Sequence, residues 1–124
     1  MAYLAGETGL GIRLRHEEAC TIVEISGELD MHAVPLLRAE LDGVVGARRP
    51  PCLVLDLTRT TFCDSLGLGL LVRTYNTVRE MGGRLALVVV PGMISRLLTI
   101  TNLDHHFETH PTAEESVAAV LQTT

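Results

Sequence analysis

The stretch "LVLDLTRTTFCDSLGLGLLVRTYN", residues 53 to 76, decides the fold class of this chain. It begins in a nearly continuous apolar run, 52–57, which is typical of a strand buried on both faces of a parallel sheet. A threonine-rich turn follows, and then a leucine-rich segment that predicts a helix from about Ser65 to Met81, stopped by two glycines. The stretch therefore predicts a strand, a turn and a helix, with Ser65 where the helix begins.

Similar units fill the rest of the chain. Periodicity of two predicts strands, and periodicity of 3.6 predicts helices. The predicted strands are 10–14, 20–27, 84–90 and a weak edge strand at 105–110, and the predicted helices are 34–45, 93–101 and 112–122. Strands that alternate with helices predict an α/β fold. We expect one domain, residues 8–121, with a mixed, mainly parallel sheet packed by about four helices.

Composition limits the function. The 124 residues fit one domain, and 47% hydrophobic residues with 3% aromatics predict an aliphatic core. The net charge of −5 argues against binding to nucleic acid or to an anionic membrane surface. No apolar run reaches the ~20 residues of a membrane span, and the N-terminus lacks the layout of a signal peptide.

The cysteines are odd in number and widely spaced. Cys20, Cys52 and Cys63 form no C-x-x-C motif, so we expect three reduced thiols in a cytoplasmic protein.

Ser65 allows several interpretations. Asp64 or Ser65 can cap the helix, which by itself implies no function. A nucleophile elbow would need Gly-x-Ser-x-Gly, and Cys63 stands at the first glycine, which argues against a serine hydrolase. The pattern from Gly67 onward lacks the third glycine of a dinucleotide-binding loop. A phosphoserine at a helix start would meet the helix dipole and free N–H donors, so Ser65 is also a candidate switch.

The face of the helix beside Ser65 is the candidate docking surface. Helical spacing predicts Leu68, Leu71, Val72, Tyr75 and Val78 in the core, and Leu66, Leu70, Arg73 and Thr77 on the solvent side. Gly67 and Gly69 leave the first turns without side chains, so another backbone could approach closely. Scattered surface leucines are the alternative interpretation.

Taken together, four segments resemble the bacterial anti-sigma factor antagonists, the small STAS-domain proteins. These segments are "SGELD" at 26–30, "LVLDLTRTTFCDSLGLGLL" at 53–71, "MGGRLALV" at 81–88 and "RLLTITNLDHHFETHPTAEESV" at 96–117. The resemblance covers residues 8 to 121. The combination of Gly-Glu-Leu-Asp and Asp-Ser-x-Gly-Leu-Gly at this separation is specific.

The resemblance implies a regulatory protein that is not an enzyme and needs no cofactor. Its partners would be an anti-sigma factor that is also a serine kinase, and a metal-dependent PP2C-type phosphatase. The phosphoacceptor would be Ser65, after Asp64, and Asp30 would lie on the same surface. Together with the solvent-side face predicted from helical spacing, which supplies the leucines, this gives Asp30, Asp64, Leu66, Gly67 and Leu70 as the expected partner-binding residues. Leu66 departs from the family pattern, which usually has a second Ser or Thr there.

Two other possibilities remain open. A STAS-type scaffold, or a subunit of a signalling or lipid-transport complex, would bind its partner without phosphorylation. His106, Glu108 and His110 would share one face of a strand and could hold zinc, but solvated edge residues are the simpler interpretation, and we expect no metal site.

Overall fold

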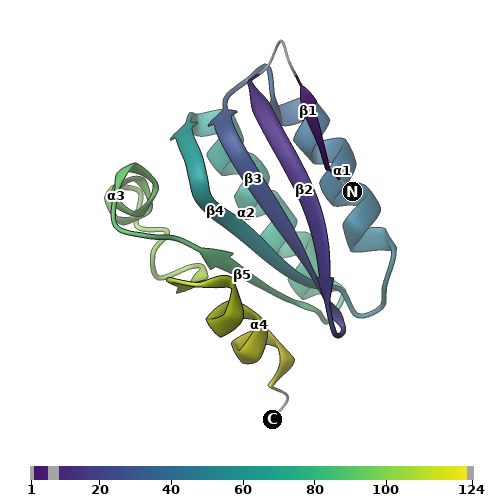
Figure 1. Cartoon of the computed structure of the whole chain (residues 1–124). Helices are drawn as coiled ribbons and strands as arrows, with labels where there is room; N and C mark the ends of the chain where they lie inside the picture. Colours follow the sequence, from purple (N-terminus) through teal and green to yellow (C-terminus); the bar gives the residue numbers. More distant parts are fainter. Residues whose placement is uncertain (1, 6–8, 123–124) are drawn as a thin grey trace.

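The structure is a computed structural model that describes residues 2–5 and 9–122. It consists of one sheet with helices on both faces (Figure 1). The strands are β1 (Ala2–Ala5), β2 (Leu10–Glu17), β3 (Cys20–Leu29), β4 (Cys52–Cys63), β5 (Arg84–Val88) and β6 (Glu108–His110). The helices are α1 (Val34–Gly46), α2 (Ser65–Glu80), α3 (Met93–Ile100) and α4 (Ala113–Leu121).

The sheet follows the order of the chain, from β1 to β6. The pairs β1–β2 and β2–β3 are antiparallel, whereas β3–β4, β4–β5 and β5–β6 are parallel. The predicted mixed, mainly parallel sheet with four helices is therefore confirmed. The sequence did not predict β1, and β4 runs six residues past the predicted end at Leu57, as far as Cys63.

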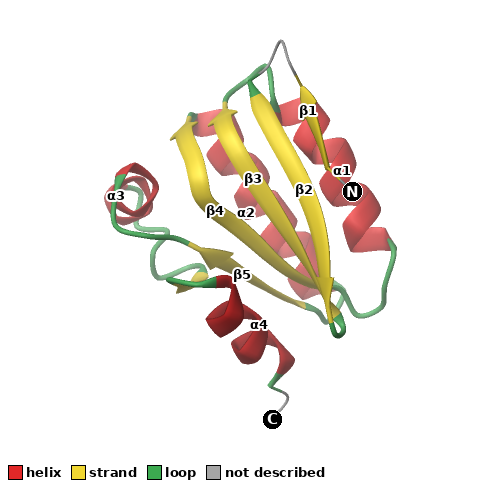
Figure 2. Ribbon diagram, viewed as in Figure 1, coloured by secondary structure: helices red, strands yellow, loops and turns green. Residues whose placement is uncertain are grey.

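Two apolar layers lie on opposite faces of the sheet. The larger one packs β2 to β5 against α1, α2 and α3, and its centre is almost entirely Leu, Val and Ile, as the composition predicts. The smaller one packs β3, β4 and β5 against α4 through residues such as Ile22, Val54 and Val120. Figure 2 shows α1 and α2 behind the strands and α4 in front of them. Among the described residues, no helix has the length and apolar character to cross a bilayer.

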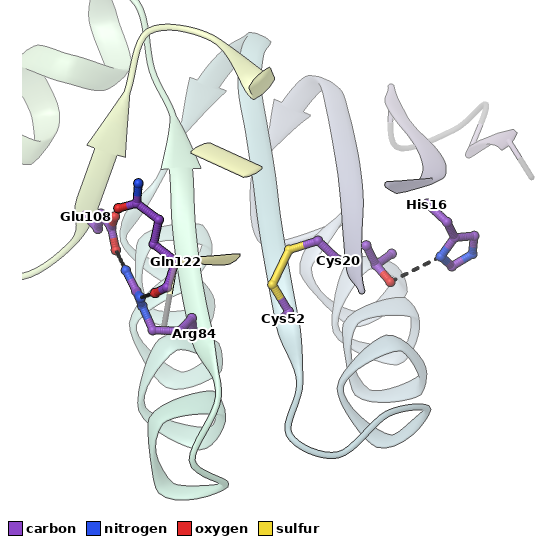
Figure 3. Close-up of a disulfide and its surroundings, with 7 residues drawn as sticks. His16, Cys20, Cys52, Arg84, Glu108 and Gln122 are labelled. Atoms are coloured by element: carbon purple, nitrogen blue, oxygen red, sulfur yellow. Dashed lines mark hydrogen bonds and ion pairs between the residues drawn. A yellow bond between two sulfur atoms is a disulfide. The ribbon is translucent and has the colours of Figure 1, made fainter. Parts of the chain in front are cut away.

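The prediction of three free thiols is wrong for two of the cysteines. Cys20 and Cys52 form a disulfide with a Cα–Cα distance of 4.7 Å (Figure 3). They begin β3 and β4, which are neighbours in the sheet, and this adjacency brings residues 32 positions apart within bonding range. Cys63 is free and buried.

We expect this disulfide to contribute measurably to stability. Closing a loop of this length removes entropy from the unfolded chain, which corresponds to about 4 kcal/mol in the chain-entropy model. Reduction of the wild type should lower its free energy of unfolding in urea by that order. The double variant Cys20→Ser, Cys52→Ser serves as the control, because its unfolding should not respond to the reductant. Identical urea midpoints for oxidised and reduced wild type would show that the bridge carries no stability.

Candidate functional site

The candidate site lies at the edge of the sheet where β3 and β4 end. The parallel register pairs Leu29 with Cys63, the last residues of the two strands. Asp30 and Asp64 follow directly, so the two sequence motifs that lie 34 positions apart meet at one edge. The backbone N–H of Asp64 donates to the carbonyl of Leu29 at 3.2 Å, which extends the pairing one step beyond the strands.

The Asp64 carboxylate joins the two motifs. It caps α2, because Oδ1 accepts a 2.9 Å hydrogen bond from the N–H of Gly67. Its other oxygen, Oδ2, accepts a 2.9 Å hydrogen bond from the N–H of Met31, in the loop after β3. One side chain therefore fixes both the start of α2 and the loop that leads into α1.

Asp30 organises its own loop. Its Oδ1 accepts hydrogen bonds from the N–H groups of His32 and Ala33, at 3.0 and 3.1 Å. Its backbone carbonyl also accepts from Ala33 and Val34, where α1 begins. The structure therefore brings Asp30 to the same edge as Asp64 and assigns it a loop-shaping role, in addition to any contact it makes with a partner.

Ser65 is exposed and is the first residue of α2. The N–H groups of a first helical turn have no acceptor within the helix. Asp64 takes the N–H of Gly67, and the N–H groups of Ser65 and Leu66 also belong to this turn. A hydroxyl in this position is accessible to another protein, and the helix N-terminus favours a negative charge beside it.

The cysteine behind Asp64 has no nucleophilic role at neutral pH. Burial, and secondarily the neighbouring Asp64 carboxylate, raise the pKa of the Cys63 thiol to about 11. The thiolate is the reactive form of cysteine, so at neutral pH this group stays protonated and behaves as a small apolar side chain. It packs against the first turn of α2, where its Sγ would lie 3.1 Å from a Cβ at position 67.

The structure corrects two of the predicted partner-binding residues. Leu70 is only 6% exposed and belongs to the main core, so it is not on the solvent side of α2. Gly67 is buried, and a Cβ there would lie 2.5 Å from the carbonyl oxygen of Leu29. The close backbone approach predicted for this glycine therefore exists, but it is internal to the chain.

A helical phase error explains both corrections. The buried residues of α2 are Gly67, Leu70, Leu71, Thr74 and Val78, which follow the i, i+3, i+4, i+7 pattern. Glycine and threonine are not strongly apolar, so the sequence pattern placed the buried face on the leucines and Tyr75. The face that is buried in the structure is rotated from that one. The Thr74 hydroxyl is satisfied by donating to the carbonyl of Leu70 at 2.8 Å. Leu66, at 56% exposure, does face solvent as predicted.

Comparison with known proteins identifies the family. The STAS domain family matches residues 11–116, which is most of the chain. The chain belongs to the STAS domain family. This confirms the resemblance drawn from the sequence motifs.

The relatives of this STAS domain are anti-sigma factor antagonists. An anti-sigma F factor antagonist of Paenibacillus polymyxa is 32% identical over 113 residues, covering 91% of this chain and 94% of the relative. An anti-sigma-B factor antagonist of Bacillus subtilis is 33% identical over 94 residues, covering 76% and 84%. The crystal structure of an anti-sigma factor antagonist from Mycobacterium paratuberculosis superposes with a TM-score of 0.85 at 28% identity, covering 96% of this chain and all of that one.

Two exposed apolar residues at the same edge of this STAS domain were missed in the sequence. Met31 is 58% exposed and follows Asp30, and Phe62 is 46% exposed near the end of β4. With Leu66 they are three large apolar residues exposed at this edge, and we call these three residues the apolar patch. Each stands alone among polar residues, so no periodicity marks it. The sequence feature that could have indicated them is a large apolar residue among turn-forming and hydroxyl-bearing residues.

The histidines expected near the C-terminus are distributed differently. His106 precedes β6, and its ring contacts that of Tyr75 in a tilted arrangement, with centroids 4.7 Å apart. His110 contacts Glu108 at 3.4 Å and shares a 2.8 Å hydrogen bond with the hydroxyl of Ser116. Ser116 is fully buried and His110 is partly exposed, and their hydrogen bond joins β6 to α4. In the described part of the chain, no group of three or more metal-ligating side chains is assembled.

The two glycines of α2 should respond oppositely to alanine. Gly67→Ala places a Cβ against the Leu29 carbonyl and should lower the free energy of unfolding by about 1–3 kcal/mol. Gly69→Ala meets no atom within 4 Å and should raise it by up to about 1 kcal/mol, because alanine is the better helix former. Urea denaturation followed by circular dichroism measures both. Equal effects of the two variants would contradict the packing described for Gly67.

Leu66 and Leu70 provide a second matched pair of variants. Leu70→Asp buries a carboxylate in the main core and should cost about 3 kcal/mol or more of unfolding free energy. Leu66→Asp changes an exposed position and should stay within about 0.5 kcal/mol of wild type. Thermal melts followed by circular dichroism separate them. A folded, stable Leu70→Asp protein would instead show that Leu70 faces solvent, as the sequence predicted.

Proposed function

We propose that this protein is an anti-sigma factor antagonist switched off by phosphorylation of Ser65. It would bind an anti-sigma factor that is also a serine kinase, release the sigma factor, and act without catalysis of its own. A PP2C-type phosphatase would restore the unphosphorylated form, and the site of action would be the cytoplasm. The observation that carries the proposal is the exposed Ser65 at the start of α2, directly after the capping Asp64, in a chain whose relatives bear this name.

The apolar patch gives the proposed partner a place to bind. Met31, Phe62 and Leu66 stand at the edge that also carries Ser65, and each is about half exposed in the free chain. Interfaces concentrate their binding energy in a few apolar or aromatic anchors that become desolvated. A partner that covers this edge would desolvate the patch and enclose the Ser65 hydroxyl at the same time.

Phosphorylation would act more strongly on the complex than on the fold. A phosphoserine adds about −1.5 to −2 charges at pH 7. In the free protein, water and the first-turn N–H groups of α2 offset that charge. In a complex the phosphate would be enclosed with Asp64, and with Asp30 on the adjoining loop. Like charges brought together at an interface cost several kcal/mol, so binding should be lost while the domain stays folded.

Leu66 is the basis of the main alternative function. Where the family usually has a second hydroxyl, this chain has an exposed leucine, which would suit a partner bound permanently through the apolar patch. This alternative is a STAS-type scaffold or subunit that binds constitutively. It predicts the same surface but no phosphorylation, so one set of proteins distinguishes the two.

The test uses wild type, its phosphorylated form, Ser65→Ala and Ser65→Asp. Incubation with the anti-sigma factor kinase and ATP should add one phosphoryl group to wild type and none to Ser65→Ala. In calorimetric titrations against the kinase, Ser65→Ala should bind like wild type, whereas Ser65→Asp and the phosphorylated protein should bind at least about tenfold more weakly. Circular dichroism controls for folding. Equal affinities across the set would leave the constitutive scaffold.

A further inference from the structure

A concave site lies on the other face of the sheet, away from Ser65. It has a volume of about 330 Å³ and lies between α4 and the hairpin that joins β2 to β3. Helix α4 packs mainly on β4, β5 and β6 and reaches β3 only in part, so the exposed outer face of β2 lies beside it, whereas Ile22 of β3 is buried. The volume falls within the range of small-molecule sites, roughly 300–1,000 Å³.

The floor of this groove is apolar. Its accessible apolar surface comes from the half-buried Val117 and Leu121 of α4, and the buried Ile22 of β3 lies beneath them. These side chains come from two elements that the sheet and the Thr112 cap hold in place. The floor is therefore a preformed surface for an aliphatic or aromatic group.

The rim of the groove is acidic. Glu17, Glu18 and Glu114 line it, and the one cation among its lining residues is Arg15. Arg15 is already neutralised, since it contacts Glu17 at 3.0 Å and Glu24 at 3.5 Å. Three carboxylates against one guanidinium leave a net charge of −2 around an apolar floor.

The hairpin fixes one rim carboxylate in an unusual way. Glu17 pairs with Cys20, so Glu18 and Ala19 form a two-residue loop. Glu18 has a φ of +57°, a conformation that such loops normally give to Gly, Asn or Asp. Glutamate is a locally unfavourable choice here, and its effect is to hold a carboxylate at the mouth of the groove.

From these features we infer that the groove between α4 and the β2–β3 hairpin binds a small organic cation with an apolar body, such as an alkylammonium or arylalkylammonium ion. The apolar part lies on Val117 and Leu121, above the buried Ile22, and the ammonium group lies among Glu17, Glu18 and Glu114. An anion of the same shape is rejected by the rim, and a cation without an apolar body lacks the contacts of the floor. The site is independent of phosphorylation at Ser65.

The experiment is a titration of the ¹⁵N-labelled full chain with n-octylammonium, monitored by heteronuclear NMR. Octanoate and methylammonium are the matched probes for charge and for the apolar body. We expect octylammonium to shift the amide signals of Ile22, Val117 and their neighbours at millimolar concentrations, and the two control ions to leave them unchanged. Added salt should weaken binding, because exposed charges are screened.

Two variants test the location. Ala118→Trp, at an exposed lining position of α4, should fill the groove and weaken binding at least tenfold. Glu114→Gln should raise the Kd about 2- to 5-fold, as expected for one exposed charge. Glu80→Gln, at the end of α2, makes the same charge change away from the groove and should bind like wild type.

Three results would overturn the inference. Equal binding of octanoate would remove the role of the acidic rim, and signal changes confined to other surfaces would remove the groove. Binding of a tetralysine peptide without octylammonium would assign the groove to a basic peptide in place of a small cation.

Discussion

The arrangement at the Ser65 edge depends on one carboxylate that accepts two hydrogen bonds from different parts of the chain. Asp64 accepts from the N–H of Gly67 in α2 and from the N–H of Met31 after β3. The two acceptors belong to one rigid group, so the helix start and the β3–α1 loop hold a fixed relation to each other. Gly67 makes this possible, since only a residue without a Cβ can lie so close to the Leu29 carbonyl. The edge is therefore preorganised before any partner arrives.

This constraint also determines what a charge at Ser65 would encounter. A helix N-terminus attracts anions through its free N–H groups, but Asp64 has already taken one of them in α2. Under the proposed function, the phosphate would meet only the remaining donors of the first turn, and it would lie beside a carboxylate that cannot move away without releasing Met31. The fold offers partial compensation to a phosphate exposed to water. The fold offers little compensation to a phosphate enclosed beside Asp64 in a complex. This difference between the free and the bound protein is what a binding switch needs.

The sequence predicted what local pattern controls and missed what contacts between distant segments control. The alternation in β2 and the apolar run that begins β4 were sufficient to place both strands, and the Asp-Ser motif placed the start of α2. The phase of α2 was wrong because its buried face includes Gly67 and Thr74, which only packing identifies as core. Likewise, the Cys20–Cys52 bridge depends on β3 and β4 being neighbours, which no spacing between the two cysteines reveals.

The two proposed sites are separated by the length of one strand. The groove lies at the start of β3, near Ile22, and the Ser65 edge lies beyond its other end at Leu29. Seven residue steps of an extended strand separate Ile22 from Leu29 and span about 23 Å, so a small cation in the groove cannot touch a partner at the edge. Coupling between them would have to pass through β3 and β4, which are joined along their length by the parallel register and at their starts by the disulfide. A shift of one strand along the other would break this register, and coupling requires an element with two arrangements. The two sites should therefore act independently, the edge in partner exchange and the groove in ligand binding.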